Sequence, residues 1–106
     1  DRALISFVLH GFPHEVRGVV LDNVHRALKP GGTLFLLDYP PFDLDKAPFH
    51  IRSGFRLVEC PNAFDFIERD WNAIFREHGF EPHVAGTFFG GYVHLLAGTR
   101  NGDGAA

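Results

Sequence analysis

Two groups of side chains that could do chemistry follow apolar runs in the sequence. His10 comes after the run Ala3–Leu9, and Asp38 and Tyr39 come after the run Thr33–Leu37. The pKa of a free imidazole is about 6.5, so His10 is suited to accept a proton from a hydroxyl group. Because ligands bind beyond the carboxyl ends of strands in open parallel sheets, we expect both groups to face one crevice. His10 and Tyr39 are therefore the candidate catalytic residues, and Asp38 or Tyr39 beside the crevice could orient an acceptor.

Each of these residues also has a purely structural interpretation. A single histidine is usually part of the core or the surface, and Asp38 and Tyr39 before a proline fit a turn that ends a strand. His10 and His14 are four residues apart, but Pro13 lies between them and no third ligand is evident. We therefore expect no metal site.

Apolar periodicity predicts the elements that position these residues. The run Ala3–Leu9 has the pattern of a strand that is buried on both faces of a parallel sheet. Residues Glu15–Leu28 form an amphipathic helix, in which Arg17 is assigned to the polar part. Lys-Pro-Gly-Gly ends this helix, and Thr33–Leu37 is the next strand. A strand, a helix and a strand in this order predict parallel pairing with a right-handed crossover.

The rest of the chain predicts a connection, a helix and a hairpin. Prolines interrupt the stretch Tyr39–Pro61, which we interpret as a packed connection or lid. Asn62 can cap a helix that runs to about His78. Two strands, Val84–Phe89 and Tyr92–Gly98, flank Gly90-Gly91, a pair suited to an antiparallel turn.

Aromatic and charged residues of the middle segment could serve an acceptor molecule. The stretch from Phe42 to Phe66 is rich in phenylalanine and could line an apolar pocket, although such residues more often form core. His50 and Arg52 could contact an anionic group on the acceptor, or they could be solvated surface residues.

Composition excludes several classes of function. The net charge is −3, and no stripe of Lys and Arg is present, so we expect no nucleic-acid partner. No run of about 18 apolar residues exists, so we expect a soluble, cytoplasmic protein with no membrane partner. Cys60 is the single cysteine and has no disulfide partner. The motifs of α/β-hydrolases, P-loop proteins and dinucleotide-binding domains are missing.

Three segments carry a resemblance to a known family. They are DRALISFVLH at 1–10, RALKPGG at 26–32 and EHGF at 77–80. Their order and spacing resemble the second half of a class I S-adenosylmethionine-dependent methyltransferase, most closely the quinone-biosynthesis and type 11 enzymes. The resemblance implies an α/β fold: a partial Rossmann-like sheet with parallel strands, a C-terminal antiparallel hairpin and helices on the sheet faces. Residues 1–100 would be the C-terminal half of the domain, and residues 101–106 a disordered tail.

The resemblance also implies a cofactor and a reaction. S-adenosylmethionine would donate a methyl group to an oxygen, nitrogen or carbon atom of a small-molecule acceptor. Ser6, Phe7 and Val8 would approach the methionine part of the cofactor; alternatively, they fill the sheet. The family's glycine-rich loop lies upstream of these segments and has no counterpart here, so we expect the chain alone to bind the cofactor poorly and to be inactive.

A sheet cut beside its first strand also predicts partners. The unpaired edge of Ala3–Leu9 should bind the missing N-terminal half or a second copy, which would give a homodimer. The alternative function is a non-catalytic half-domain that acts as an interaction or self-association module. A third possibility, the end of a nucleotide-dependent oxidoreductase, is disfavoured by the terminal hairpin.

Overall fold

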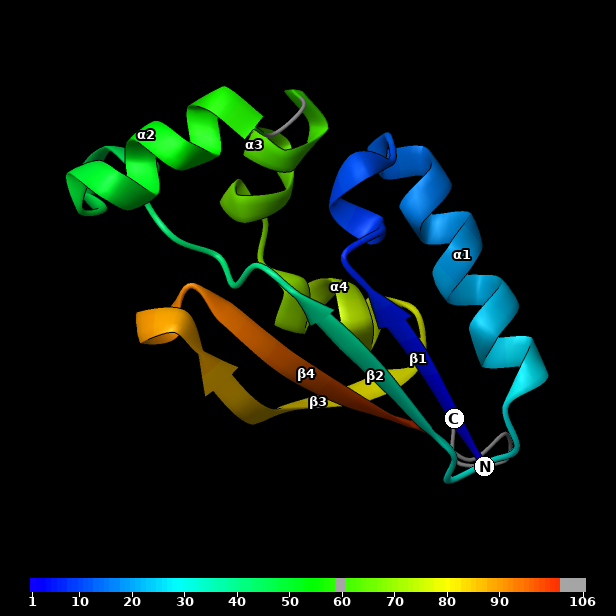
Figure 1. Cartoon of the computed structure of the whole chain (residues 1–106). Coiled ribbons are helices and arrows are strands. Elements are labelled where there is room, and N and C mark those ends of the chain that lie inside the picture. Colours follow the sequence, from blue (N-terminus) through cyan, green and yellow to red (C-terminus); the bar gives the residue numbers. More distant parts are fainter. Residues whose placement is uncertain (59–60, 102–106) are drawn as a thin grey trace.

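The computed structural model describes residues 1–58 and 61–101, which form one four-stranded sheet and the helices around it. Figure 1 shows their arrangement. The strand order is β1-β2-β4-β3. β1 (Arg2–Ser6) pairs in parallel with β2 (Thr33–Asp38), and β2 pairs antiparallel with β4 (Val93–Arg100). β4 also pairs antiparallel with β3 (Phe80–Phe88). This mixed sheet, with its parallel pair and its C-terminal antiparallel hairpin, confirms the predicted α/β fold class.

Helix α1 (His14–Ala27) connects the two parallel strands, close to the predicted bounds. It begins directly after Pro13, with Glu15 in its first turn and Arg26 in its last turn, an arrangement that suits the helix dipole. Gly31 then adopts a φ of +83°, which a residue with a side chain rarely adopts, and the chain turns into β2.

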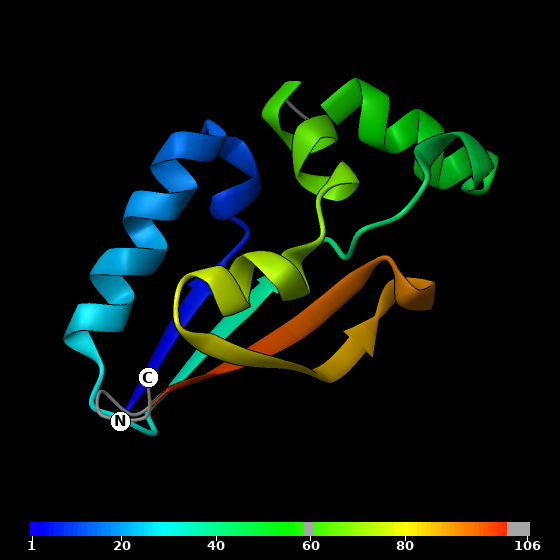
Figure 2. The same ribbon diagram turned by 180° about the vertical axis from the view of Figure 1, so that it is seen from behind.

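The helices α1 and α4 (Trp71–Glu77) lie on the same face of the sheet (Figure 2). Between them and the strands lies the core, whose largest fully buried apolar side chains are Trp71, Phe66, Phe75, Phe80, Leu9, Leu21, Leu34, Leu36 and Leu96. No helix of the described residues covers the opposite face, where Leu4 is 67% exposed. The prediction that Ala3–Leu9 is buried on both faces is therefore wrong, because the described chain supplies a helical layer to one face only.

The first strand is also shorter than predicted. β1 ends at Ser6 because Phe7 turns the chain with a φ of +53°, and Leu9–Gly11 form a short 3-10 helix, η1. The amide of Phe7 still donates to the Leu37 carbonyl at 2.9 Å. This turn brings His10 back over the end of the sheet.

The stretch Tyr39–Pro61 contains more helix than predicted. It holds the 3-10 turn η2 (Leu44–Lys46) and the helix α2 (Phe49–Val58). Pro48 stands just before α2, where the missing N–H of proline costs nothing, and its carbonyl accepts the Arg52 amide at 2.9 Å. Cys60 lies outside the described residues.

The single helix predicted over Asn62–His78 is two helices, α3 (Pro61–Glu68) and α4. The break occurs because the Asp70 carboxylate accepts the Ala73 amide at 3.2 Å and so caps the start of α4. Asn62 is not the predicted cap; its side chain instead donates to the carbonyl of Gly11 at 3.1 Å.

The terminal hairpin begins earlier than predicted, since β3 starts at Phe80. Pro82 is tolerated within it because β3 is an edge strand. Positive φ angles at Phe89, Gly90 and Gly91 close the hairpin. The Asn101 amide donates to the Gly79 carbonyl at 2.9 Å, and residues 102–106 of the predicted tail lie outside the described residues. Within the described part of the chain, no helix has the length and apolar character needed to cross a membrane.

Candidate active site

His10 and Asp38 meet at the carboxyl ends of the two parallel strands. The Nδ1 atom of His10 lies 2.8 Å from Asp38 Oδ1, and the His10 amide donates to Asp38 Oδ2 at 3.4 Å. The Asp38 side chain is completely buried, whereas the His10 side chain is 13% exposed. When Nδ1 donates to the carboxylate, the lone pair of the ring is on Nε2. This is the arrangement of a general base held by an acid.

The buried carboxylate of Asp38 has further polar neighbours. The Tyr39 amide donates to its Oδ1 atom at 2.8 Å, which helps to satisfy a charge removed from water. His94 of β4 is directly opposite Asp38 in the sheet and is also buried. Burial lowers the pKa of His94, and the negative charge of Asp38 acts in the opposite direction. His94 is therefore favoured in its neutral form near pH 7.

Aromatic rings surround His10 on the side of the strand ends. The ring centroid of His10 lies 5.2 Å from that of Tyr39 and 6.3 Å from that of Phe66. Phe7 contacts Tyr39 edge-on at 6.2 Å. The structure thus brings together the two candidate catalytic residues, His10 and Tyr39, in an environment that is mostly apolar.

A depression of about 360 Å³ opens beside Tyr39. Its lining is largely aromatic and apolar: Tyr39, Phe42, His50, Ile51, Gly54, Phe55, Phe89, Tyr92 and Val93. Part of the phenylalanine-rich segment does line a pocket here, and His50 borders it. Arg52 does not line this pocket; it stacks over Phe49 at 5.9 Å and donates to the Asp45 carbonyl at 3.3 Å.

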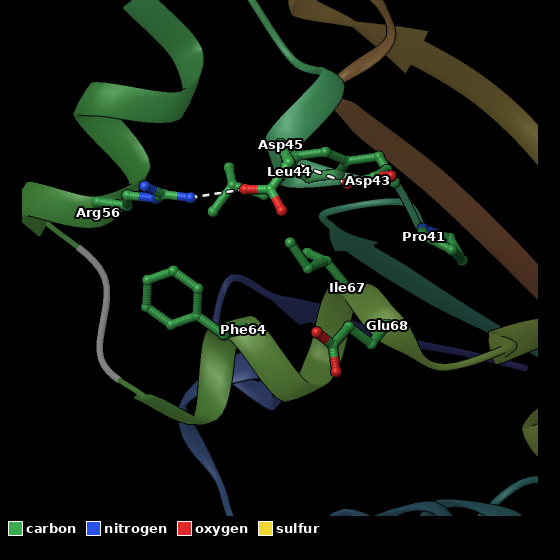
Figure 3. Close-up of a pocket in the computed structure, with 9 residues that line it drawn as sticks. Pro41, Asp43, Leu44, Asp45, Arg56, Phe64, Ile67 and Glu68 are labelled. Atoms are coloured by element: carbon green, nitrogen blue, oxygen red, sulfur yellow. Dashed lines mark hydrogen bonds and ion pairs between the residues drawn. The ribbon is translucent and has the colours of Figure 1, made fainter. Parts of the chain in front are cut away.

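A second, larger depression of about 740 Å³ lies between α2, η2 and α3 (Figure 3). Figure 3 shows Arg56 reaching Asp45, with the two side chains 2.7 Å apart. Phe64 and Ile67 form its apolar side. None of the candidate catalytic residues lines it, so we place the candidate active site at the smaller depression.

Ser6, the last residue of β1, is exposed, and so are Phe7 and Val8 in the turn that follows. Their side chains do not fill the sheet, contrary to the alternative considered for them. Phe7, 42% exposed, also lines an apolar depression of about 440 Å³ on the uncovered sheet face, with Leu4, Leu37, Phe88, Phe89, Val93 and Leu95. The role of Ser6, Phe7 and Val8 as contacts to the cofactor stays a prediction.

Sequence reasoning missed two features of this site. The contact between Asp38 and His10 joins residues 28 positions apart, and only the parallel pairing of β1 and β2 brings them together. Arg17, which was assigned to the polar part of α1, is completely buried. The sequence did contain a clue to this burial, because Arg17 stands four residues before the buried Leu21 and so lies on the same face of the helix. Across residues 1–58 and 61–101, no three His, Cys, Asp or Glu side chains are placed to hold a metal ion.

Comparison with known proteins gives this geometry a context. Over 84 residues the chain is 30% identical to O-methyltransferase 12 of Dictyostelium discoideum, and over 92 residues it is 26% identical to O-methyltransferase 3 of the same organism. The relatives are O-methyltransferases. These matches cover 76% and 80% of this chain but 22% and 21% of the relatives, so the chain spans about a fifth of their length. No protein-family model matches the chain.

The fold has a counterpart among solved structures. An O-methyltransferase family protein from Burkholderia thailandensis superimposes with a TM-score of 0.64 at 21% sequence identity. The match covers 96% of this chain and 30% of that protein. The α/β sheet described above is therefore consistent with part of the Rossmann-like methyltransferase fold.

Proposed function

We propose that this chain provides the acceptor side of an O-methyltransferase, which transfers a methyl group from S-adenosylmethionine to a hydroxyl group of a small apolar molecule. The observation that carries the proposal is the contact of 2.8 Å between His10 and the buried Asp38, beside an aromatic depression. The similarity to two O-methyltransferases supports methyl transfer as the general reaction.

In this reaction His10 is the general base. With Nδ1–H donated to Asp38, the Nε2 atom would take the proton of the acceptor hydroxyl as its oxygen bonds to the methyl carbon. The bond between that carbon and the sulfonium sulfur would break in the same step, and S-adenosylhomocysteine would leave. The carboxylate of Asp38 stabilises the imidazolium that forms, and its burial strengthens this interaction. Such base catalysis typically contributes about 100- to 10,000-fold to a rate.

The aromatic depression positions the acceptor. Tyr39 lies both in its lining and against His10, so an apolar ring or chain held there would have its hydroxyl near the base. Phe42 and Phe55 add apolar surface to the same depression. Alignment of this kind, rather than a strong base alone, is the larger source of rate in a two-substrate reaction.

The residues at the turn after β1 fit one side of the cofactor. Ser6, Phe7 and Val8 offer a hydroxyl group and apolar surface at the carboxyl end of a parallel strand, where ligands of such sheets bind. Bound there, S-adenosylmethionine would supply the electrophilic methyl group. We propose that residues beyond this part of the sheet, from the same protein or from another polypeptide, complete the cofactor site.

The sheet itself indicates where those residues bind. β1 is an edge strand, and the apolar face beside it is uncovered. We propose that the N-terminal half of a methyltransferase, or a second copy of this chain in a homodimer, pairs with this edge. The closer relation to quinone-biosynthesis and type 11 enzymes and a cytoplasmic location are further parts of this proposal. A purely non-catalytic module is less favoured, because it leaves the dyad of His10 and Asp38 without a role.

Calorimetry with S-adenosylhomocysteine and a methyl-transfer assay test the proposal together. Both are run with the chain alone and with the separately expressed residues of O-methyltransferase 12 that precede the matched segment. A panel of small aryl and alkyl alcohols and labelled S-adenosylmethionine serve as substrates. We expect transfer in the complemented sample and a loss of about 100-fold or more in His10→Asn. Cofactor binding without transfer to any alcohol, or an active His10→Asn variant, would refute the proposed function.

A further inference from the structure

Among the described residues, Arg17 is the one arginine or lysine whose side chain is completely buried. Its Nη1 atom lies 2.7 Å from the Asp65 carboxylate of α3, and its guanidinium carbon lies 5.1 Å from the Phe66 ring. Hydrogen bonds from Arg69 and, to a smaller extent, from Arg17 hold the pKa of Asp65 below its usual range, so its counter-charge is present at neutral pH. An apolar side chain of similar volume would avoid the desolvation of a charge. What the guanidinium adds is therefore directional hydrogen bonding.

Those hydrogen bonds converge on η1, the three-residue turn that carries His10. Arg17 Nε donates to the Leu9 carbonyl at 2.9 Å, and Nη2 donates to the His10 carbonyl at 3.1 Å. The same Nη2 atom donates to the Asn62 carbonyl at 2.7 Å, while the Asn62 side chain donates to the Gly11 carbonyl. All three carbonyls of η1 thus accept a hydrogen bond from a side chain of α1 or α3.

We propose that Arg17 is a positioning residue for His10. The inference rests on the proposed function, in which His10 is the base. η1 has only one turn of its own backbone hydrogen bonds, so little within it prevents rotation of the His10 peptide. The guanidinium of Arg17 fixes that peptide through its hydrogen bonds to the Leu9 and His10 carbonyls, and Asp38 at the end of β2 fixes the imidazole. With both in place, the ring has one orientation and one tautomer.

The same contacts couple the base to the acceptor depression. α3 carries Asp65 and Asn62, which bind Arg17 and η1, and it also carries Phe64, which packs on Phe55 at 5.1 Å. Phe55 lines the aromatic depression. Docking of α3 against η1 therefore sets the orientation of His10 and one wall of the acceptor site in a single event.

The test compares Arg17→Met and Arg17→Lys with a matched control, Arg69→Met. Arg69 also binds Asp65, at 2.9 Å, but its hydrogen bond does not involve η1. Long-range ¹H–¹⁵N spectra of the ring report which nitrogen of His10 carries the proton. We expect the Nδ1–H form in the native chain and in Arg69→Met, and a mixture of tautomers in Arg17→Met. In the complemented enzyme, kcat should fall by about 100-fold in Arg17→Met with little change in the KM of the acceptor.

The outcomes separate this inference from the function on which it rests. An unchanged His10 spectrum in a folded Arg17→Met chain would overturn the positioning role. If that variant does not fold, Arg17→Lys and Asn62→Ala decide by the same spectra, since each removes only part of the contacts. A changed spectrum together with full activity of His10→Asn would support the positioning of His10 and refute its role as the base.

Discussion

Phe55→Ala should release helix α2 from the rest of the molecule. Phe55 is buried, whereas two other large apolar residues of the helix, Phe49 and Leu57, are 74% and 83% exposed. The Phe55 ring makes edge-on contacts with Tyr39 and Phe64, each at 5.1 Å. Removing a buried phenylalanine costs about 3–5 kcal/mol in a rigid core. In this protein the loss of stability in Phe55→Ala cannot exceed the free energy that docks α2 onto the rest of the chain. Once the helix is undocked, it has no further contact to lose.

Hydrogen exchange in the native chain measures the free energy that docks α2, and urea unfolding measures the stability lost in Phe55→Ala. We expect the two free energies to be equal. In the native chain, α2 amides should exchange through a local opening of at most about 3–5 kcal/mol. In Phe55→Ala these amides should lose their protection, and the free energy of unfolding should fall by the same amount as that opening. Leu57→Ala is the control and should change neither quantity. Protected α2 amides in Phe55→Ala would refute the reasoning, since other contacts would then hold the helix.

Three further predictions concern the site and the turns. Asp38→Asn removes the buried charge beside the candidate base. Methyl transfer in the complemented enzyme should then fall by about 10- to 100-fold, because a hydrogen bond to a charged group is worth about 1.5–3 kcal/mol. An unchanged rate would contradict the pairing of His10 with Asp38. The folded pKa of His94 is lowered, so the unfolded chain binds its proton more readily, and stability should fall as pH decreases below about 6.5. Urea midpoints between pH 5 and 7 should depend less on pH in His94→Gln. Gly79→Ala should destabilise the fold by about 1–3 kcal/mol or more in thermal unfolding, because a Cβ atom would lie 2.5 Å from the His25 ring at a φ of +86°. Gly54→Ala, where no atom lies within 4 Å of the added Cβ, should be neutral or slightly stabilising.

Local patterns were sufficient to predict much of the sheet. Short apolar runs separated by a helix give parallel strands, and two strands around Gly90-Gly91 give an antiparallel pair. The candidate residues His10 and Tyr39 could be placed together for the same reason, since both follow strands that end at one edge. What could not be predicted was the partner of each polar group. Asp38 was expected only to orient an acceptor, and its contact with His10 depends on the strand register.

The two clearest errors have different physical causes. Arg17 was assigned to the polar part of α1 because a charge is normally solvated, yet Asp65 and the carbonyls of η1 satisfy it in the interior. The middle segment was assigned little regular structure because of its prolines, yet Pro48 starts α2 rather than preventing it. The first error arises because a single sequence does not contain tertiary contacts, whereas the second arises from a local rule, since proline is well tolerated at a helix start.

The contact between His10 and Asp38 depends on the register in which β1 pairs with β2. Ser6 is opposite Leu37 in the native register, which places the turn carrying His10 over Asp38. A shift by one residue would move the imidazole by about 3.3 Å along the strand, more than the 2.8 Å that now separates the two side chains. A chain misaligned in this way would lose the dyad, and the inward side chains of β1 would turn to the opposite face of the sheet. Substitutions at the opposite end of these strands, near Arg2 and Thr33, could then abolish chemistry without touching the site, and the His10 ring spectrum would detect them.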